Sequence, residues 1–188
     1  FGLRKDELDM LYTAYYQNPI EENGTINVNL YLALNQATSS PIANIIFQFF
    51  DKGKVNRLTF NDYLISIWNF ITLKEIDMIS FIWSLFDTNQ HGMMEVEEIT
   101  MMIDFIWGFK EDPERTEKYE LLKLSFDKKV CLNEVVLLYR YNKSLFQPVF
   151  DLQEQLKLNT CTNFFWKRLI KRRYKMFHPG RKKSDGAH

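Results

Sequence analysis

Residues 87–98 carry the most complete set of chemically functional side chains in this sequence. They read Asp-Thr-Asn-Gln-His-Gly-Met-Met-Glu-Val-Glu-Glu. A twelve-residue loop of this kind surrounds Ca²⁺ with oxygen ligands, and a glycine at position 6 allows the sharp turn. The expected ligands are Asp87, Asn89, His91, the carbonyl of Met93, Glu95 and Glu98, and the turn residue is Gly92. Because calcium prefers oxygen, the imidazole at position 5 weakens the predicted site.

This loop is the third of four copies of a repeat, at residues 19–30, 51–62, 87–98 and 123–134. The copies align on an apolar residue at position 8, which is Ile26, Leu58, Met94 and Val130 in turn. Four copies in register favour a repeated helix–loop–helix unit over a chance match. Paired loops exchange a short antiparallel backbone contact at position 8, so this position can stay apolar after metal ligands are lost. We therefore expect an all-α protein with short β contacts between paired loops.

The other three loops lack side chains that hold calcium. The first ends with Leu30 instead of a carboxylate, and the second has Gly53 and Val55 where oxygen ligands belong. The fourth begins with Lys123 and has Lys128 at its turn, so its own cations would oppose Ca²⁺. At most one site, in the third loop, is predicted to bind calcium. The alternative for that loop is a folded but empty turn.

The organisation resembles the EF-hand superfamily, in particular four-hand proteins of the calmodulin and calcineurin B type. The resemblance covers about residues 3–144 and is strongest in the first helix, 3–12, and in the Ser-Pro-Ile of 40–42 leading into 45–51. It implies two lobes of paired hands and an apolar groove that grips an amphipathic helix of a target protein.

The predicted division of the chain is an N-terminal pair of hands at 1–72, a C-terminal pair at 73–144 and a helical extension at 145–188. Thr72 and Glu75 have the spacing of a capping box, which predicts the start of a helix at the second pair. The join between the pairs has no flexible linker composition, so we expect the lobes to pack rigidly.

Composition favours a cytoplasmic protein without catalytic machinery. The chain has 188 residues, no net charge, and no apolar run long enough to span a bilayer. No secretory leader is recognised, and Cys131 and Cys161 lack the spacing of a metal site or a disulfide framework. The sequence also lacks a phosphate-cradling glycine loop, a nucleophile elbow and a zinc helix, so we expect no enzyme.

The extension begins with an expected helix from Pro148 through about residue 158, which could occupy the groove that would otherwise receive a target. Beyond it, residues 164–188 hold nine Lys or Arg and one acid, whereas residues 1–163 hold fifteen and twenty-three. Phe165, Trp166, Leu169, Ile170 and Phe177 gather toward one side of a helix that Arg173 interrupts.

A basic amphipathic helix is typical of segments that bind a protein or a membrane surface. Its predicted contact residues are Trp166, Lys167, Arg168, Lys171, Arg172, Arg173 and Lys175. Three interpretations stay open: the helix folds back on the acidic lobes, it binds an acidic protein surface or filament, or it meets anionic lipid. Nucleic acid is another anionic partner under the third interpretation, and it is disfavoured.

Two functions remain open at this point. The first is a calcium-responsive regulatory subunit that binds a target protein, with Ca²⁺ held in residues 87–98. The second is a calcium-independent adaptor in a larger assembly, such as a cytoskeletal or axonemal one. Methionines 93, 94, 101 and 102 could form an adaptable target groove, but core packing is the favoured interpretation.

Overall fold

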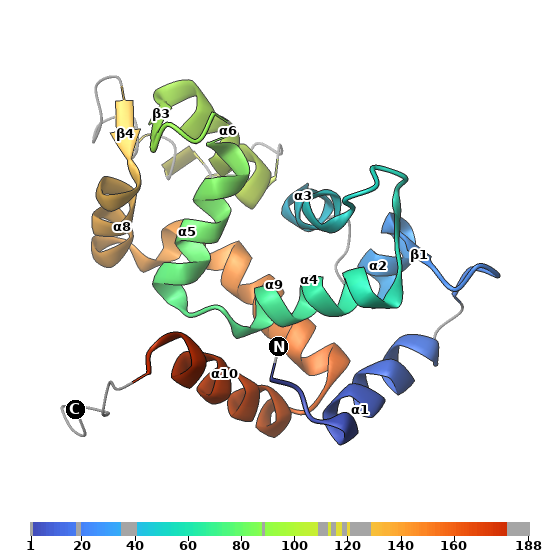
Figure 1. The fold of residues 1–188 in the computed structure, drawn as a ribbon. Helices are drawn as coiled ribbons and strands as arrows, with labels where there is room; N and C mark the ends of the chain where they lie inside the picture. Colours follow the sequence, from blue (N-terminus) through green and yellow to red (C-terminus); the bar gives the residue numbers. More distant parts are fainter. Residues whose placement is uncertain are drawn as a thin grey trace.

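The computed structural model describes residues 2–17, 20–34, 41–87, 89–108, 113, 116–117, 120 and 129–179, and the chain within them is mostly helical (Figure 1). The first half contains α1 (Lys5–Tyr16), β1 (Ile26–Asn27), α2 (Val28–Leu34), α3 (Pro41–Phe50), β2 (Arg57–Leu58) and α4 (Phe60–Thr72). The second half contains α5 (Glu75–Phe86), β3 (Met93–Glu95), α6 (Val96–Trp107), β4 (Lys129–Cys131), α8 (Leu132–Tyr141), the 3₁₀ helix η1 (Lys143–Phe146), α9 (Gln147–Thr160) and α10 (Asn163–Phe177). The expectation of an essentially helical protein is confirmed at this level.

Two short antiparallel sheets tie the helices together in pairs. β1 pairs with β2 so that Ile26 lies opposite Leu58, and β3 pairs with β4 so that Met94 lies opposite Val130. These four residues are the ones that the repeat aligns at position 8, and all four are fully buried. Each sheet therefore places two apolar side chains in the core and joins the helices that flank it.

Proline lies in the first turn of two helices, and the start at Pro148 is the one predicted above. Pro41 is the first residue of α3, and Pro148 stands in the first turn of α9, where a missing N–H costs nothing. The predicted capping box of Thr72 and Glu75 is wrong. Thr72 is the last residue of α4, where its hydroxyl donates to the carbonyl of Trp68, and Lys74 precedes the first turn of α5 without a side-chain cap.

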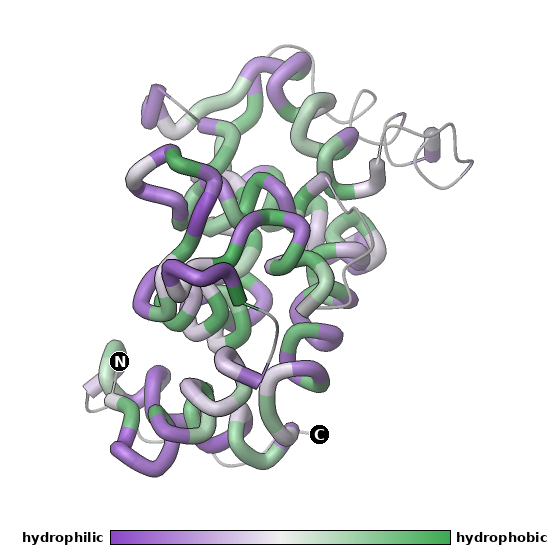
Figure 2. Tube along the Cα trace, turned by 90° about the vertical axis from the view of Figure 1, so that its right-hand side faces the viewer, coloured by the Kyte–Doolittle hydropathy of each residue, from purple (hydrophilic) through white to green (hydrophobic). Residues whose placement is uncertain are grey.

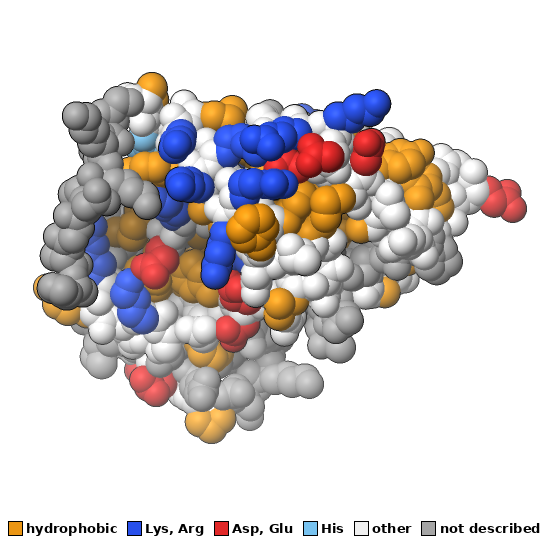
Figure 3. All heavy atoms as spheres, turned by 90° about the horizontal axis from the view of Figure 1, so that it is seen from below, with side chains coloured by type: hydrophobic (Ala, Val, Ile, Leu, Met, Phe, Trp, Pro, Cys, Tyr) orange, Lys and Arg blue, Asp and Glu red, His pale blue; other side chains and the backbone are white. Residues whose placement is uncertain are grey.

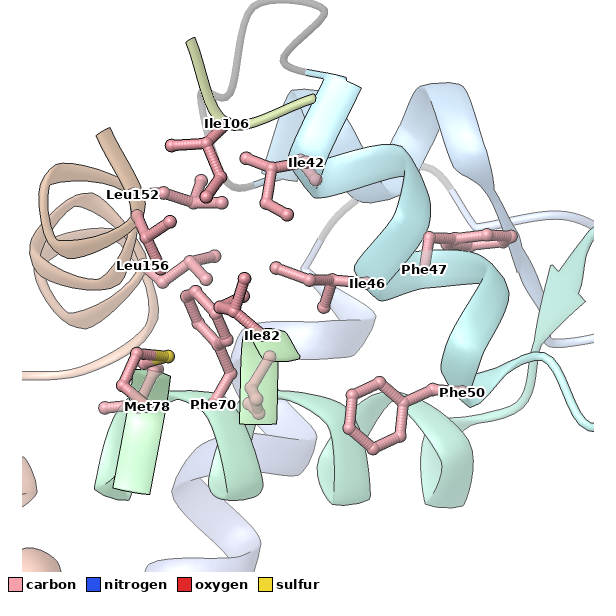
Figure 4. Close-up of a cluster of buried hydrophobic side chains, with 14 of the residues drawn as sticks. Ile42, Ile46, Phe47, Phe50, Phe70, Met78, Ile82, Ile106, Leu152 and Leu156 are labelled. Atoms are coloured by element: carbon pink, nitrogen blue, oxygen red, sulfur yellow. The ribbon is translucent and has the colours of Figure 1, made fainter. Parts of the chain in front are cut away.

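The core is one continuous cluster of apolar side chains drawn from both halves of the chain. Helix α9 runs through its middle and contacts both α4 and α6 (Figure 1). Leu152 and Leu156 of α9 point toward Ile46 of α3 and Ile106 of α6 (Figure 4). The helix added after the repeats thus fills the space between the α2–α4 group and the α5–α8 group.

Gln153 anchors α9 to the end of α4. Its side-chain amide donates to the carbonyl oxygens of Phe70 at 2.8 Å, Ile71 at 3.3 Å and Leu73 at 3.0 Å. The last carbonyls of a helix have no partner within it, so a buried amide at this point satisfies groups that water cannot reach.

Hydrophilic and hydrophobic residues alternate along the helical segments, as the colouring of the tube shows (Figure 2). Within the described part of the chain, no helix combines the length and apolar character that crossing a bilayer requires.

Candidate calcium loop and basic helix

The third loop is folded by its own first carboxylate. Asp87 follows directly after α5, and its two oxygens accept the backbone N–H groups of His91 at 3.2 Å and Gly92 at 2.9 Å. The backbone turns through positive φ at Gln90 (52°) and Gly92 (72°). A Cβ at Gly92 would have no atom within 4 Å, so backbone conformation and not space favours glycine there.

The second loop has the same local geometry, although Gly53 and Val55 supply no side-chain oxygen. Asp51 accepts from the backbone N–H groups of Val55 at 3.2 Å and Asn56 at 2.6 Å. Positive φ values occur at the equivalent positions, 51° at Lys54 and 57° at Asn56, a residue type that tolerates this region. The folded shape of these loops therefore persists without a full set of metal ligands, and shape alone does not argue for a metal.

The closing carboxylate of the third loop caps the helix that follows it. Glu98 accepts the backbone N–H of Glu95 at 2.9 Å. The same reciprocal cap joins Asp62 to Thr59 in the second loop and Glu134 to Cys131 in the fourth. A carboxylate at a helix N-terminus is stabilising without any metal. It accepts a hydrogen bond from a free backbone N–H, and its negative charge is attracted to the positive end of the helix dipole.

A cation already lies beside the third loop. Lys129 stands opposite Glu95 in the β3–β4 sheet, and its ammonium is 2.8 Å from the Glu95 carboxylate. The hydrogen bond that Lys129 donates to Glu95 is the main reason why the pKa of Lys129 is raised above its ordinary value. A metal ion in the loop would have to share this carboxylate with Lys129 or displace it.

The predicted calcium ligands all lie on one loop and differ in their exposure to solvent. Asp87 and Glu98 are half-buried, whereas the other four, Asn89, His91, Met93 and Glu95, are exposed. Among the described residues, no group of three or more His, Cys, Asp or Glu side chains is placed to hold a metal. The oxygens of Asp87, Asn89, Glu95 and Glu98 fit a hard cation chemically, and His91 does not. Calcium binding stays a prediction.

The methionines near this loop divide between core and surface. Met94 and Met102 are fully buried, while Met93 and Met101 are 48% and 55% exposed. For the buried pair, core packing accounts for the residue type.

The basic helix α10 folds back on the rest of the chain. Phe165, Trp166 and Leu169 are buried, and α10 packs on α4 and α9. The predicted surface residue Trp166 has no exposed area, and its indole N–H donates to Thr160 Oγ1 at 3.1 Å. Trp166 is therefore part of the core instead of a surface open to a partner.

Two arginines of α10 enclose Glu7 of α1. The Glu7 side chain is fully buried, and its oxygens lie 2.7 Å from Arg168 Nη2 and 2.6 Å from Arg172 Nη1. It also accepts the backbone N–H of Arg4 at 2.8 Å, and Arg172 donates as well to the carbonyl of Gly2. Burial by itself raises the pKa of Glu7, but the bonds from Arg172 and Arg4 and the two positive charges outweigh it, so the pKa is lowered. We call this group the Glu7 clasp.

Arg173, which interrupted the apolar stripe in the sequence, lies at the C-terminal end of α4. Its guanidinium donates to Asn69 O at 3.2 Å and to Thr72 Oγ1 at 2.7 Å, and lies over the ring of Trp68 with its carbon 4.4 Å from the centroid. A cation here is favourable because the helix dipole is negative at this end. Burial lowers the pKa of Arg173.

The remaining predicted contact residues, Lys167, Lys171 and Lys175, are exposed. Figure 3 shows Lys and Arg side chains gathered over α10, with acidic side chains bordering them on the side of α1. Within the described residues, none of these three lysines forms an ion pair. The seven residues predicted as one surface therefore divide into an engaged inner set and an exposed lysine set.

Sequence reasoning did not identify an open groove of about 930 Å³ beside the start of α5. Ile76, Tyr139, Phe150 and Ile170 are among the residues that line it, and the ion pair between Glu75 and Lys143, 2.8 Å long, stands at its wall. The wall combines residues of α5, α8, α9 and α10, so no single amphipathic helix in the sequence indicates it.

No family model matches this sequence, and no curated protein matches it significantly.

Proposed function

We propose that this chain is an EF-hand-type adaptor that binds another protein, with residues 87–98 as its one candidate calcium loop. The observation that carries the proposal is the pairing of Ile26 with Leu58 and of Met94 with Val130, the residues that the sequence repeat aligns at position 8. In the EF-hand pattern these loop positions join two hands back to back. The equivalent turns at Asp51 and Asp87 also support a common origin of the loops.

Calcium, if bound, would be held by Asp87, Asn89, Glu95 and Glu98 together with the Met93 carbonyl, and would neutralise the carboxylates at the start of α6. The chain's own residues already order the ends of this loop, through the turn at Asp87 and the cap at Glu98. Since position 5 is a histidine and Lys129 competes for Glu95, we expect weak affinity, with Kd about 10⁻⁵ M or above.

The target surface is proposed to be the groove beside α5, because α9 fills the space between the two groups of helices. Leu156 is 1% exposed in that space, so a target helix could enter only by expelling α9. By contrast, the groove of about 930 Å³ is open and lined by apolar side chains such as Ile76, which is 38% exposed. Grooves with an apolar floor and a charged rim are typical of peptide-binding surfaces.

Calorimetric titration of calcium into the full chain, at physiological magnesium, tests whether residues 87–98 bind calcium. Glu98→Gln removes the bidentate carboxylate but keeps an acceptor for the helix cap. Glu97→Gln is the matched control, because Glu97 is exposed and adjacent and stands at no ligand position. The proposal expects one-site heat in the wild type and in the control, and none in Glu98→Gln. Absence of heat in all three folded chains would rule out calcium binding.

A calcium-independent adaptor is the second candidate, and the 2.8 Å ion pair between Lys129 and Glu95 favours it. In that case the repeats serve as a scaffold for the groove beside α5. Ile76→Arg would then abolish partner capture with or without calcium, whereas Leu137→Arg, at a 49% exposed site on α8, would leave capture intact. If Ile76→Arg still bound the partner as well as Leu137→Arg does, the partner would bind elsewhere on the molecule.

A further inference from the structure

The arginines of helix α10 contact the rest of the chain, whereas its lysines face solvent. Residues 163–177 contain three arginines, three lysines and no acidic residue. Arg168, Arg172 and Arg173 make hydrogen bonds or ion pairs with α1 and α4, as described above. The lysines are all exposed. The buried apolar side chains and the arginines hold α10 against the rest of the chain, whereas the lysines form no ion pair with the described residues.

The three lysines form a single row. Lys167, Lys171 and Lys175 recur at every fourth position, which places them on one helix face about 6 Å apart along the axis. Like charges at this spacing repel each other and weaken a helix. A row that costs stability and pairs with no described carboxylate is suited to an anionic surface outside the chain.

A large apolar side chain stands exposed beside the row. Phe164 is 75% exposed and lies three residues before Lys167, on the same face of α10. A soluble polyanion offers such a side chain no apolar environment, whereas the interface of a bilayer accepts aromatic and aliphatic groups next to lysines.

We propose that the outer face of α10 binds the surface of an anionic lipid bilayer, with Lys167, Lys171 and Lys175 at the headgroups and Phe164 in the interface. Binding is peripheral and reversible, because three charges and one apolar side chain make a weak anchor. The proposal goes beyond the adaptor function, since it adds a membrane contact on a face separate from the α5 groove.

Sedimentation of the full chain with vesicles tests the lysine row. The chain is expected to bind phosphatidylcholine vesicles that contain phosphatidylserine, and not vesicles of phosphatidylcholine alone. Each lysine near an anionic surface is worth about a fivefold change in partitioning, so Lys167→Gln/Lys171→Gln should bind roughly 25-fold more weakly. Lys52→Gln/Lys54→Gln, which removes two exposed charges on another loop, is the matched control and should bind like the wild type. No binding to the anionic vesicles, or equal loss in both variants, would overturn the proposal.

A second pair of variants separates a bilayer from a soluble polyanion. Phe164→Ser should weaken binding to the anionic vesicles severalfold but leave retention on heparin unchanged. Tyr141→Ser removes an aromatic side chain that is 89% exposed on α8 and should change neither. If Phe164→Ser has no effect on the vesicles, the row recognises only negative charge, as an acidic protein or a nucleic acid presents it, and the bilayer assignment is wrong.

Discussion

Substitution of Glu7 by Gln probes the contact that holds α10 to α1. The side chain is fully buried, and in the structure it meets two guanidinium groups within 2.7 Å and a backbone N–H at 2.8 Å. Gln keeps the size of the side chain and one acceptor oxygen. It removes the negative charge and leaves Arg168 and Arg172 facing each other without compensation.

The expected loss of stability is about 2–3 kcal/mol. Breaking a buried ion pair from one side costs roughly 3–5 kcal/mol, because the remaining charge stays desolvated. The expected loss lies at or below the lower end of this range, since the side chains of Arg168 and Arg172 are 36% and 23% exposed and water can solvate them in part. For a chain of this size, such a loss lowers the Tm by about 5–10 °C.

Thermal unfolding followed by circular dichroism measures this effect. Glu75→Gln is the matched control. The ion pair of Glu75 with Lys143, at 2.8 Å, is nearly as short as those of Glu7, but it joins side chains that are 60% and 59% exposed. Exposed pairs contribute little, so the control should melt close to the wild type. If Glu7→Gln melts with the control, the clasp contributes no more than a surface pair, and the argument from burial fails.

Four further outcomes are expected. The lowered pKa of Glu7 means that its stabilisation is present above the ordinary value of about 4.5 and is lost as the pH falls through the lower native value, so the gap in Tm between wild type and Glu7→Gln should close in acid. Gln153→Ala should cost about 1–3 kcal/mol in urea unfolding, because three carbonyls at the end of α4 lose a buried donor. Leu156→Ala should cost about 3 kcal/mol in the same assay, whereas Leu158→Ala, at a 65% exposed site, should cost little; equal effects would contradict the buried position of α9. Lys129→Gln should tighten calcium binding severalfold in calorimetry, since it frees the carboxylate of the facing strand.

The sequence predicted the parts of the fold that depend on local or repeated patterns. The register of the two sheets follows from apolar residues such as Leu58 and Val130, which recur at one position of each repeat. The starts of α3 and α9 follow from Pro41 and Pro148, because proline restricts its own backbone. These signals lie within a few residues of the structure that they specify.

Contacts between distant segments could not be predicted in this way. Helical periodicity placed Arg173 as an interruption of an apolar stripe, and only the packing of α10 on α4 gives it the carbonyl of Asn69 and the hydroxyl of Thr72 as partners. The failed capping box also involves Thr72, which ends α4 and uses its hydroxyl within that helix end instead of capping α5. Glu7 resembled an ordinary acidic residue in a first helical turn, and its two cations are about 165 residues away in the sequence.

The same distinction between local features and long-range contacts applies to the candidate calcium loop. The residue types of the third loop and its turn at Gly92 are visible in the sequence, and the structure has the turn at that residue. The ion pair of Glu95 with Lys129 depends on which strand pairs with β3, and Lys129 belongs to another copy of the repeat. A ligand set can therefore be recognised locally, while the charge that competes for it comes from the partner strand.

The Glu7 clasp also constrains the order of events during synthesis on the ribosome. Arg168 and Arg172 are translated some 160 residues after Glu7, so the carboxylate lacks these two partners while the intervening residues are synthesised. A carboxylate without a partner favours water over a buried position. We infer that α1 stays hydrated and loosely attached to the nascent chain, and that its docking coincides with the arrival of α10. Closing so long a loop is a late step in folding, and it makes the burial of α1 depend on the docking of α10.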